Sequence, residues 1–126
     1  METQTTYAIG VMSGTSLDGL DIAYCKFDEL QNKLSYKVIN AKTIKYLDIE
    51  RQKLSNAHLL NATDFIKLHA EYGTYIGEQV LSFIKQYNCK PSFIASHGHT
   101  IFHNPQEKIT FQLGSGAHIY AVAGIP

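Results

Sequence analysis

The sequence lacks tryptophan and has only three prolines and two cysteines among its 126 residues. Neither sign of charge is in excess, because 11 lysines and arginines balance 11 aspartates and glutamates. Affinity for nucleic acid rests largely on basic residues that neutralise phosphates, so this balance argues against a nucleic-acid partner. It also argues against electrostatic attachment to a membrane surface.

Cysteine use and the start of the chain indicate the compartment. Cys25 and Cys89 are too few for a disulfide framework, so we expect two reduced thiols in an intracellular protein. No base precedes Lys26, whereas a secretory signal peptide begins with positive charge, so we expect none. The longest apolar run, residues 117–125, is too short to span a bilayer. The sequence therefore predicts a cytoplasmic protein with neither a nucleic acid nor a membrane as partner.

Enough apolar sequence is present to build one packed domain, since 44% of the residues are hydrophobic and 17% are charged. Three segments rich in β-forming residues open the chain, at residues 7–12, 20–27 and 34–46. A dense turn cluster at residues 13–19 joins the first two segments, and a polar turn at residues 28–33 joins the next two. This part of the chain predicts an antiparallel meander of three strands.

The middle of the chain changes to a helical period. Residues 49–60 predict a short helix, and Asn61 is a good N-cap for a longer one, with Asp64 three residues on. Gly73 and Gly77 share one side of this long helix, which indicates either the close approach of another element or a kink. An apolar stripe recurs at steps of three and four residues, formed by Phe65, His69, Tyr72, Ile76, Val80, Phe83 and Tyr87.

The last third of the chain returns to strands. Residues 92–96 follow the long helix, and a strand reached by a helical crossover lies parallel to an earlier strand. Residues 101–103 and 109–113 predict a hairpin, residues 117–123 a final helix, and residues 124–126 the approach to a further strand. The whole order predicts an α/β fold.

The first candidate site is the turn Gly-Thr-Ser-Leu-Asp-Gly at residues 14–19. Glycines expose backbone N–H groups, Thr15 and Ser16 add hydroxyl donors, and such a turn can form an anion-binding nest. Asp18 suits a magnesium-bound water, because hard cations prefer carboxylate oxygens. The turn is not a Walker loop, since no Gly-Lys-Ser/Thr follows. The plain alternative, which composition alone favours, is that Asp18 and Gly19 make a tight hairpin turn, and the two interpretations are compatible.

Histidines form the second candidate. His97 follows a strand at the end where α/β sheets bind ligands, so it is suited to orient a sugar hydroxyl or a carboxylate; the alternative is a histidine that satisfies a loop backbone. In an extended segment His97 and His99 point the same way. Together with His103 they suggest a transition-metal site, although no acidic or cysteine ligand lies close in sequence. A third candidate, around Ser115, is an anion site at a helix N-terminus or, more simply, a connection with Ser115 as N-cap.

Residues 10–21, Gly-Val-Met-Ser-Gly-Thr-Ser-Leu-Asp-Gly-Leu-Asp, resemble the N-terminal signature of the anhydro-N-acetylmuramic acid kinase family. The resemblance spans nearly the whole chain and is weakest between Asp28 and Asn61. Two positions depart from the family, which usually has glutamine where this chain has His99 and aspartate where it has Ser115. Later motifs agree in order and spacing, namely residues 96–100, Pro105, residues 110–114 and residues 124–126.

The resemblance implies the actin/hexokinase-type sugar kinase fold, in which two ribonuclease-H-like domains close over ATP. Residues 1–126 are then expected to form a truncated N-terminal ribonuclease-H-like lobe, with the second lobe absent. Family members use water and ATP to open the 1,6-anhydro ring of anhydro-N-acetylmuramic acid and phosphorylate O6, which gives N-acetylmuramic acid 6-phosphate in murein recycling. The aspartate that activates the water lies just beyond the position of Pro126. We therefore expect no catalytic residue here, and an inactive isolated chain.

The resemblance also implies ligands and site residues. ATP and magnesium are the expected cofactors, an amino sugar is the expected small-molecule ligand, and a homodimer is the assembly that the family suggests. His97 and the backbone of Gly98 are expected to face the sugar, and Asp18 to help place magnesium. A non-catalytic phosphate- or sugar-binding module is the alternative function. The residues expected to bind ATP are Gly14, Thr15, Ser16, Leu17, Asp18, Gly19, Leu20 and Asp21.

Overall fold

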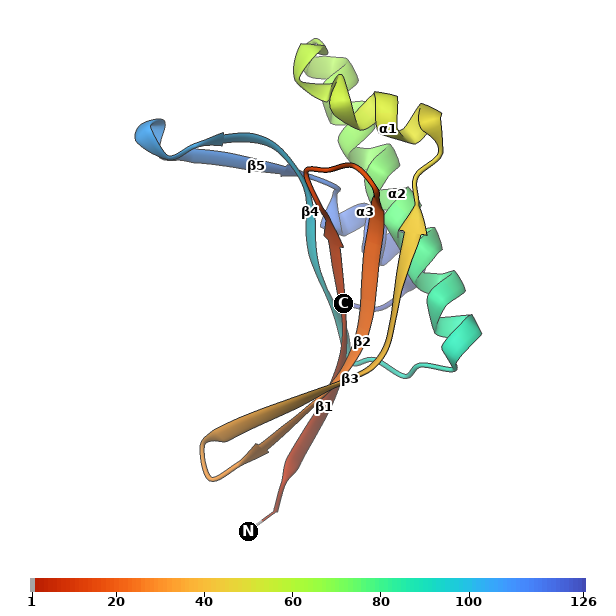
Figure 1. The fold of residues 1–126 in the computed structure, drawn as a ribbon, viewed down its shortest axis with the longest axis vertical. Coiled ribbons are helices and arrows are strands. Elements are labelled where there is room, and N and C mark those ends of the chain that lie inside the picture. The colour runs from red at the N-terminus through yellow and green to blue at the C-terminus, as the bar shows by residue number, and fades with distance from the viewer. Residues whose placement is uncertain (1) are drawn as a thin grey trace.

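Three antiparallel strands open the chain, which confirms the predicted meander. The turn between the second and third strands is shorter than predicted, because Gln31 and Asn32 both adopt positive φ and close a tight hairpin. The computed structural model describes residues 2–126, and its first three strands are β1 (Gln4–Ser13), β2 (Gly19–Leu30) and β3 (Lys33–Lys45) (Figure 1).

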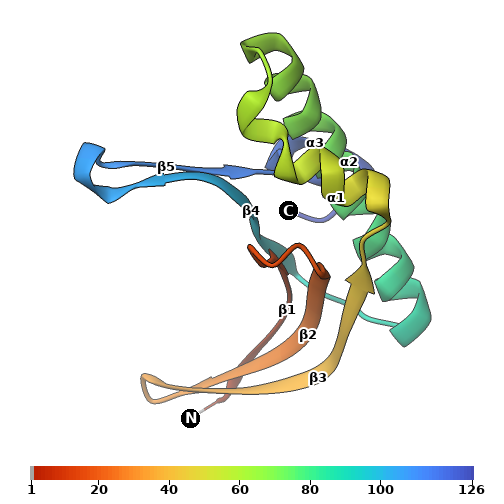
Figure 2. The ribbon, with the colours of Figure 1, turned by 45° about the horizontal axis from the view of Figure 1, so that its top comes forward.

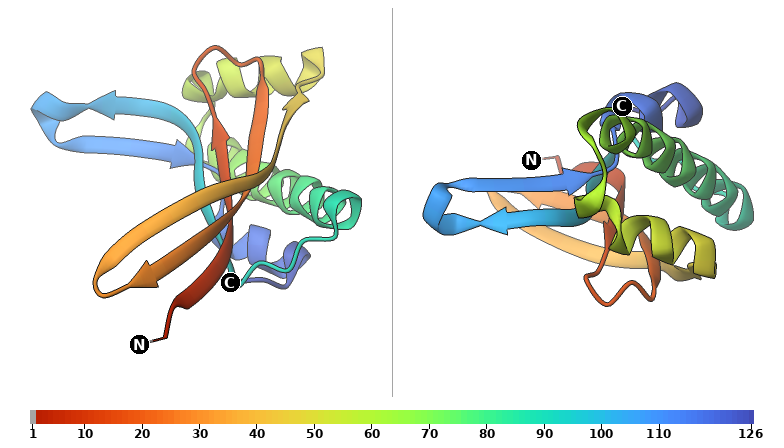
Figure 3. Two further views of the ribbon diagram at one scale, coloured as in Figure 1. Left: turned by 60° about the horizontal axis from the view of Figure 1, so that its bottom comes forward. Right: turned by 90° about the horizontal axis from the view of Figure 1, so that it is seen from above.

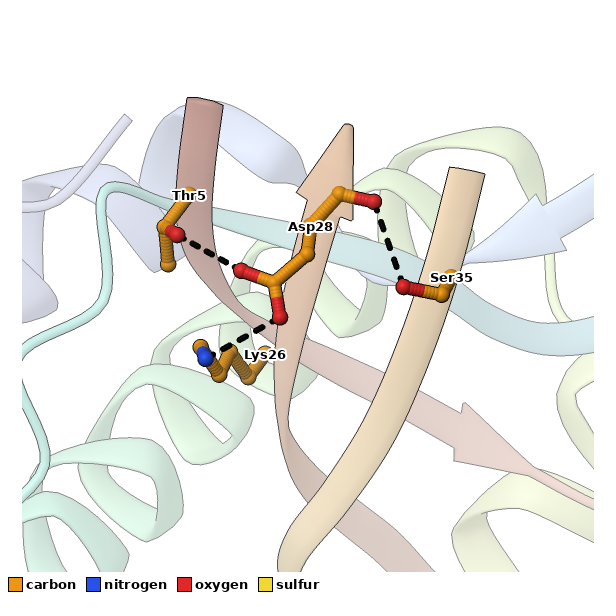
Figure 4. Close-up of polar contacts among 4 residues, drawn as sticks. All are labelled: Thr5, Lys26, Asp28 and Ser35. Carbon is orange, nitrogen blue, oxygen red and sulfur yellow. Dashed lines mark hydrogen bonds and ion pairs between the residues drawn. The ribbon is translucent and has the colours of Figure 1, made fainter. Parts of the chain in front are cut away.

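Polar side chains link the three strands where they extend away from the helices (Figure 4). The Thr5 hydroxyl donates to the Asp28 carboxylate at 2.6 Å, and Lys26 pairs with the same carboxylate at 3.0 Å. The Ser35 hydroxyl donates to the Asp28 carbonyl at 3.4 Å. The bond from Thr5 and then the contact with Lys26 lower the pKa of the Asp28 carboxyl. Exposed pairs of this kind add little stability.

The fourth strand, β4 (Phe93–Asn104), lies parallel to β1, as the preceding helix predicts. It is far longer than the expected strand at residues 92–96, and the prediction that a loop follows residue 96 is wrong. Gly98 sits at a φ of 69° and the register with β1 shifts there, so the strand bulges and continues. The predicted hairpin is confirmed, since β4 pairs antiparallel with β5 (Ile109–Leu113), and the sheet order is β3-β2-β1-β4-β5.

The three α-helices within residues 2–126 all cover one face of this mixed sheet (Figures 2 and 3). The helix predicted at residues 49–60 is interrupted at Asn56, where α1 ends and a single 3₁₀ turn, Ala57–Leu59, begins. Asn61 is the predicted N-cap and accepts a hydrogen bond from the Asp64 N–H at 2.8 Å. The α-helices are α1 (Asp48–Ser55), α2 (Ala62–Tyr87) and α3 (Gly116–Ala123).

The core lies between α2 and the sheet. The predicted stripe on α2 faces inward, because its members are buried or half-buried while its opposite face is exposed. Gly73 and Gly77 mark close approach rather than a kink, since a β-carbon on either would meet α3 or the turn before it. The largest fully buried side chains are Phe83, Ile9, Leu20, Ile22, Ile76, Leu113 and Val80.

Two further expectations concern the cysteines and the end of the chain. Cys25 is half-buried, Cys89 is buried, and both are free thiols, as predicted. The carbonyl of Pro126 accepts a hydrogen bond from the Ile94 N–H at 2.7 Å. Residues 124–126, which were expected to approach a further strand, therefore lie beside β4. Across residues 2–126, no helix combines the length and the apolar character needed to cross a membrane.

Candidate functional site

The turn between β1 and β2 is an exposed, hydrogen-bonding loop. The Leu17 N–H donates to the Gly14 carbonyl at 3.1 Å, and Leu17 at a φ of 58° turns its side chain onto the core. Thr15, Ser16 and Asp18 are exposed. Within residues 2–126, no backbone carbonyl accepts from the Thr15 or Ser16 amides. The loop therefore presents amides, two hydroxyls and one carboxylate to solvent, which is the donor set for a phosphate with a hydrated magnesium ion.

The remaining three residues of the predicted ATP-binding stretch differ in accessibility. Gly19 and Leu20 are buried at the start of β2, so no side chain there reaches a ligand. Asp21 is exposed, and its carboxylate accepts a hydrogen bond from the Thr43 hydroxyl of β3 at 2.5 Å. The part of the stretch that can contact a nucleotide is thus the loop at residues 14–18, with Asp21 on the sheet beside it.

His97 and Asp21 lie on the same sheet face, opposite the face that the helices cover. Both line a hollow of about 680 Å³ whose floor is the sheet itself, with Met12 half-exposed among them. Gly98 is buried, because the space that a β-carbon would take is filled by the Leu113 carbonyl of β5. Two residues proposed on sequence grounds for different ligands, Asp21 and His97, therefore share one surface.

The expectation that His97 and His99 point the same way is wrong. His97 lies on the open face, whereas His99 is only 5% exposed and contacts Ser13 in the interior. The extra residue at the Gly98 bulge breaks the alternation of a regular strand. Among residues 2–126 no three histidine, cysteine, aspartate or glutamate side chains gather as a metal site, so the suggested site with His103 is not assembled.

A buried chain of hydrogen bonds, which we call the relay, runs beneath the loop and was not predicted. The Tyr46 hydroxyl donates to Ser13 Oγ at 2.7 Å and lies 2.5 Å from the Tyr72 hydroxyl. Ser13 Oγ in turn lies 2.9 Å from His99 Nδ1. Burial raises the pKa of both tyrosines and lowers that of His99. The members are 26 to 86 residues apart, so no local pattern could reveal them.

The third candidate, around Ser115, is a structural connection. The Ser115 hydroxyl accepts from the His118 N–H at 3.4 Å, which confirms the N-cap interpretation. The Gly114 N–H donates to His69 Nδ1 at 2.9 Å and the Ser115 N–H to the His69 carbonyl at 3.0 Å. Because His69 takes both amides, they are not available to an anion.

Two histidines are expected to make the folded state sensitive to mild acid. Burial lowers the pKa of His99 and, together with the charge of His118, that of His69, from an ordinary 6.5. Below that value the unfolded chain binds more protons than the folded chain. The contribution of these histidines to the free energy of unfolding is therefore fully present above pH 6.5 and is lost as the pH falls below it. Each histidine contributes a slope of up to about 1.4 kcal/mol per pH unit.

Urea unfolding between about pH 7.5 and about pH 5 measures this slope. His99→Gln should make it shallower, whereas His103→Gln, which changes an exposed side chain, should leave it as in the unmodified chain. A slope that is zero or reversed in the unmodified chain contradicts the expectation.

Comparison with known proteins matches the family model described as anhydro-N-acetylmuramic acid kinase to residues 6–126. The protein of that name from Francisella tularensis subsp. novicida is 38% identical over 127 residues, which cover 90% of this chain and 32% of that protein. The one from Rhodopseudomonas palustris is 34% identical over 128 residues, with 94% and 35% covered. The one from Pseudoalteromonas translucida is 32% identical over 131 residues, with 93% and 33% covered. The chain thus spans about a third of the length of these relatives.

Proposed function

This chain belongs to the anhydro-N-acetylmuramic acid kinase family, and from that premise we propose that it forms the N-terminal, ribonuclease-H-like lobe of an ATP-dependent sugar kinase. A meander of three strands, a helical crossover and a parallel fourth strand beside β1 support this assignment. The full-length kinase is proposed to convert anhydro-N-acetylmuramic acid, water and ATP into N-acetylmuramic acid 6-phosphate and ADP, a step of cell-wall murein recycling. The water adds across the anhydro bond, and the phosphoryl group goes to O6.

The observation that carries the proposal is the loop at residues 14–18. Its free amides and the hydroxyls of Thr15 and Ser16 are suited to hold the ATP phosphates. The exposed Asp18 carboxylate is a hard oxygen ligand suited to a water of hydrated magnesium. Magnesium, when bound, would neutralise the charge that builds up on the transferred phosphoryl group. The role of this chain is therefore to position the nucleotide.

The sugar side of the proposal rests on the open sheet face. His97 and Asp21 line its hollow. An imidazole can donate and accept hydrogen bonds and a carboxylate can accept them, so both suit the orientation of sugar hydroxyls. Phosphoryl transfer also needs water to be excluded, which a second lobe closing over this face would achieve. The aspartate that activates the water is proposed to lie beyond Pro126, so the isolated chain is expected to bind without turnover.

Titration of the isotope-labelled chain with Mg–ATP, up to about 1 mM and beyond, tests the nucleotide assignment by amide NMR. The amides of residues 14–18 should shift and saturate, and Asp18→Asn should weaken the magnesium-dependent part of the response. Asp48→Asn is the matched control, since it removes a carboxylate that is also exposed, from α1. Shifts spread over the surface, or none in the loop, would remove this assignment. Saturable binding of the anhydro sugar, without turnover in the full-length protein, would favour the non-catalytic binding module instead.

A further inference from the structure

Tyr46 contacts both ends of the loop. Its hydroxyl donates to Ser13, the residue that precedes Gly14, at 2.7 Å. Its backbone N–H donates to the carbonyl of Asp18, where the loop ends, at 3.3 Å. Tyr46 is only 2% exposed and Ser13 only 3%, so the side-chain bond is shielded from competing water. One buried residue thus fixes the entry and the exit of the loop.

The relay has one donor order that satisfies every member. Because Tyr46 donates to Ser13, the Ser13 hydroxyl proton is left to donate to His99 Nδ1 at 2.9 Å. The Tyr72 hydroxyl then donates to that of Tyr46. A neutral imidazole with its proton on Nε2 accepts at Nδ1, whereas an imidazolium donates from both nitrogens. Protonation of His99 therefore removes the acceptor on which the relay ends.

Resting on the nucleotide function proposed for the loop, we propose that Tyr46 and His99 are positioning residues that hold the loop in its phosphate-binding shape. Both are buried beneath the loop rather than exposed on it. His99 acts through Ser13, and Tyr46 acts through Ser13 and the Asp18 carbonyl. In this arrangement the neutral form of His99 keeps the loop ordered and its protonation loosens it. Nucleotide affinity then falls in mild acid through a side chain that the nucleotide never contacts.

His99 lies between two uncharged strand neighbours, Ser13 on β1 and Leu113 on β5. Burial is the main influence on the pKa of His99 and lowers it, and hydrogen bonding with the Ser13 backbone raises it. The other titratable groups that face the relay act on its tyrosines, namely Glu50 on α1, Asp21 on β2 and Tyr75 on α2.

Amide hydrogen exchange in the 126-residue chain tests the role of Tyr46 without any nucleotide. The reporter is the Leu17 N–H, which bonds to Gly14 inside the loop, and the deeply buried Ile76 amide corrects for global unfolding. Tyr46→Phe should lower the protection of Leu17 by about five- to tenfold. Tyr75→Phe is the control, because the Tyr75 ring stacks on Tyr72 and lies tilted against Tyr46 without joining the relay. In this variant the protection of Leu17 should stay within about twofold of that in the unmodified chain.

The pH profile separates positioning from a merely structural role. In the unmodified chain, the His99 ring should carry its proton on Nε2 at neutral pH by nitrogen chemical shift. Leu17 protection, corrected for intrinsic exchange, should fall in acid with the midpoint of the His99 ring titration. His99→Gln, whose amide oxygen accepts from Ser13 but does not titrate, should keep the protection and flatten its profile.

Two outcomes overturn the proposal. One is Leu17 protection in Tyr46→Phe that equals that of Tyr75→Phe. The other is Leu17 protection in the unmodified chain that does not change over the His99 titration, or Leu17 protection that changes with pH to the same extent in His99→Gln. Failure of the nucleotide assignment is recognised separately, since the unmodified chain would then show no Mg–ATP shifts in residues 14–18 while the exchange results stand. If all the results hold, Mg–ATP affinity should fall in acid by the same factor as Leu17 protection, and not in His99→Gln.

Discussion

Asp18→Asn in the full-length kinase is expected to lower kcat by about 100-fold or more, because it removes the exposed carboxylate of the loop at residues 14–18, which we propose holds the ATP phosphates. The amide keeps the size and the hydrogen-bonding shape of the side chain but loses the charge that attracts a hydrated cation. Steady-state release of ADP at saturating sugar, with magnesium varied, measures the change. The variant should also need more magnesium to reach half of its own maximal rate.

Asp48→Asn provides the comparison for that experiment. Asp48 is an exposed acid in the first turn of α1, with a loose 3.8 Å contact to Arg51 that contributes little. Its kcat should stay within about twofold of the unmodified enzyme. If Asp18→Asn behaves like Asp48→Asn, Asp18 has no part in handling the nucleotide.

Gly98→Ala is expected to destabilise the isolated chain by about 3 kcal/mol. Two costs add: the residue sits at a φ of 69°, which side chains rarely adopt, and its β-carbon would overlap the Leu113 carbonyl. Leu113 is fully buried and paired with His99, so it cannot move aside cheaply. The loss appears as a lower urea midpoint with an unchanged slope.

Gly10→Ala is the matched control, since Gly10 lies on a neighbouring strand and a β-carbon there meets no atom within 4 Å. It should change stability by less than about 0.5 kcal/mol. If Gly98→Ala were as mild as Gly10→Ala, the bulge would not depend on glycine and its effect on His97 and His99 would need another cause.

The order of elements was predictable because each left a local pattern. The stripe from Phe65 to Tyr87 repeats at helical spacing, and Asn61 caps the helix as its position before the stripe indicates. The turn at residues 14–19 was recognisable from its two glycines and two hydroxyls. The helix at residues 49–60 was only partly right, since Asn56 ends α1 before the 3₁₀ turn.

What failed depends on contacts between distant segments. The bulge at Gly98 exists because β4 continues beside β1 and pairs with β5. The local sequence around Gly98 does not indicate either pairing. Its consequence is that His97 faces the open hollow while His99 is buried beside Ser13. The sequence pattern placed Tyr46 only at the end of a strand. In the structure its hydroxyl bonds to Ser13 and its N–H to the Asp18 carbonyl, at the two ends of the loop.

The most direct test of the kinase assignment is the product formed by the full-length protein from anhydro-N-acetylmuramic acid and Mg–ATP. Mass spectrometry should find a sugar that has gained one water and one phosphoryl group, formed in equal amount with ADP. Phosphate on O6 should be confirmed by NMR, and the isolated 126-residue chain should form none. ADP release without a sugar phosphate, or a phosphorylated sugar that keeps its anhydro ring, would contradict the account.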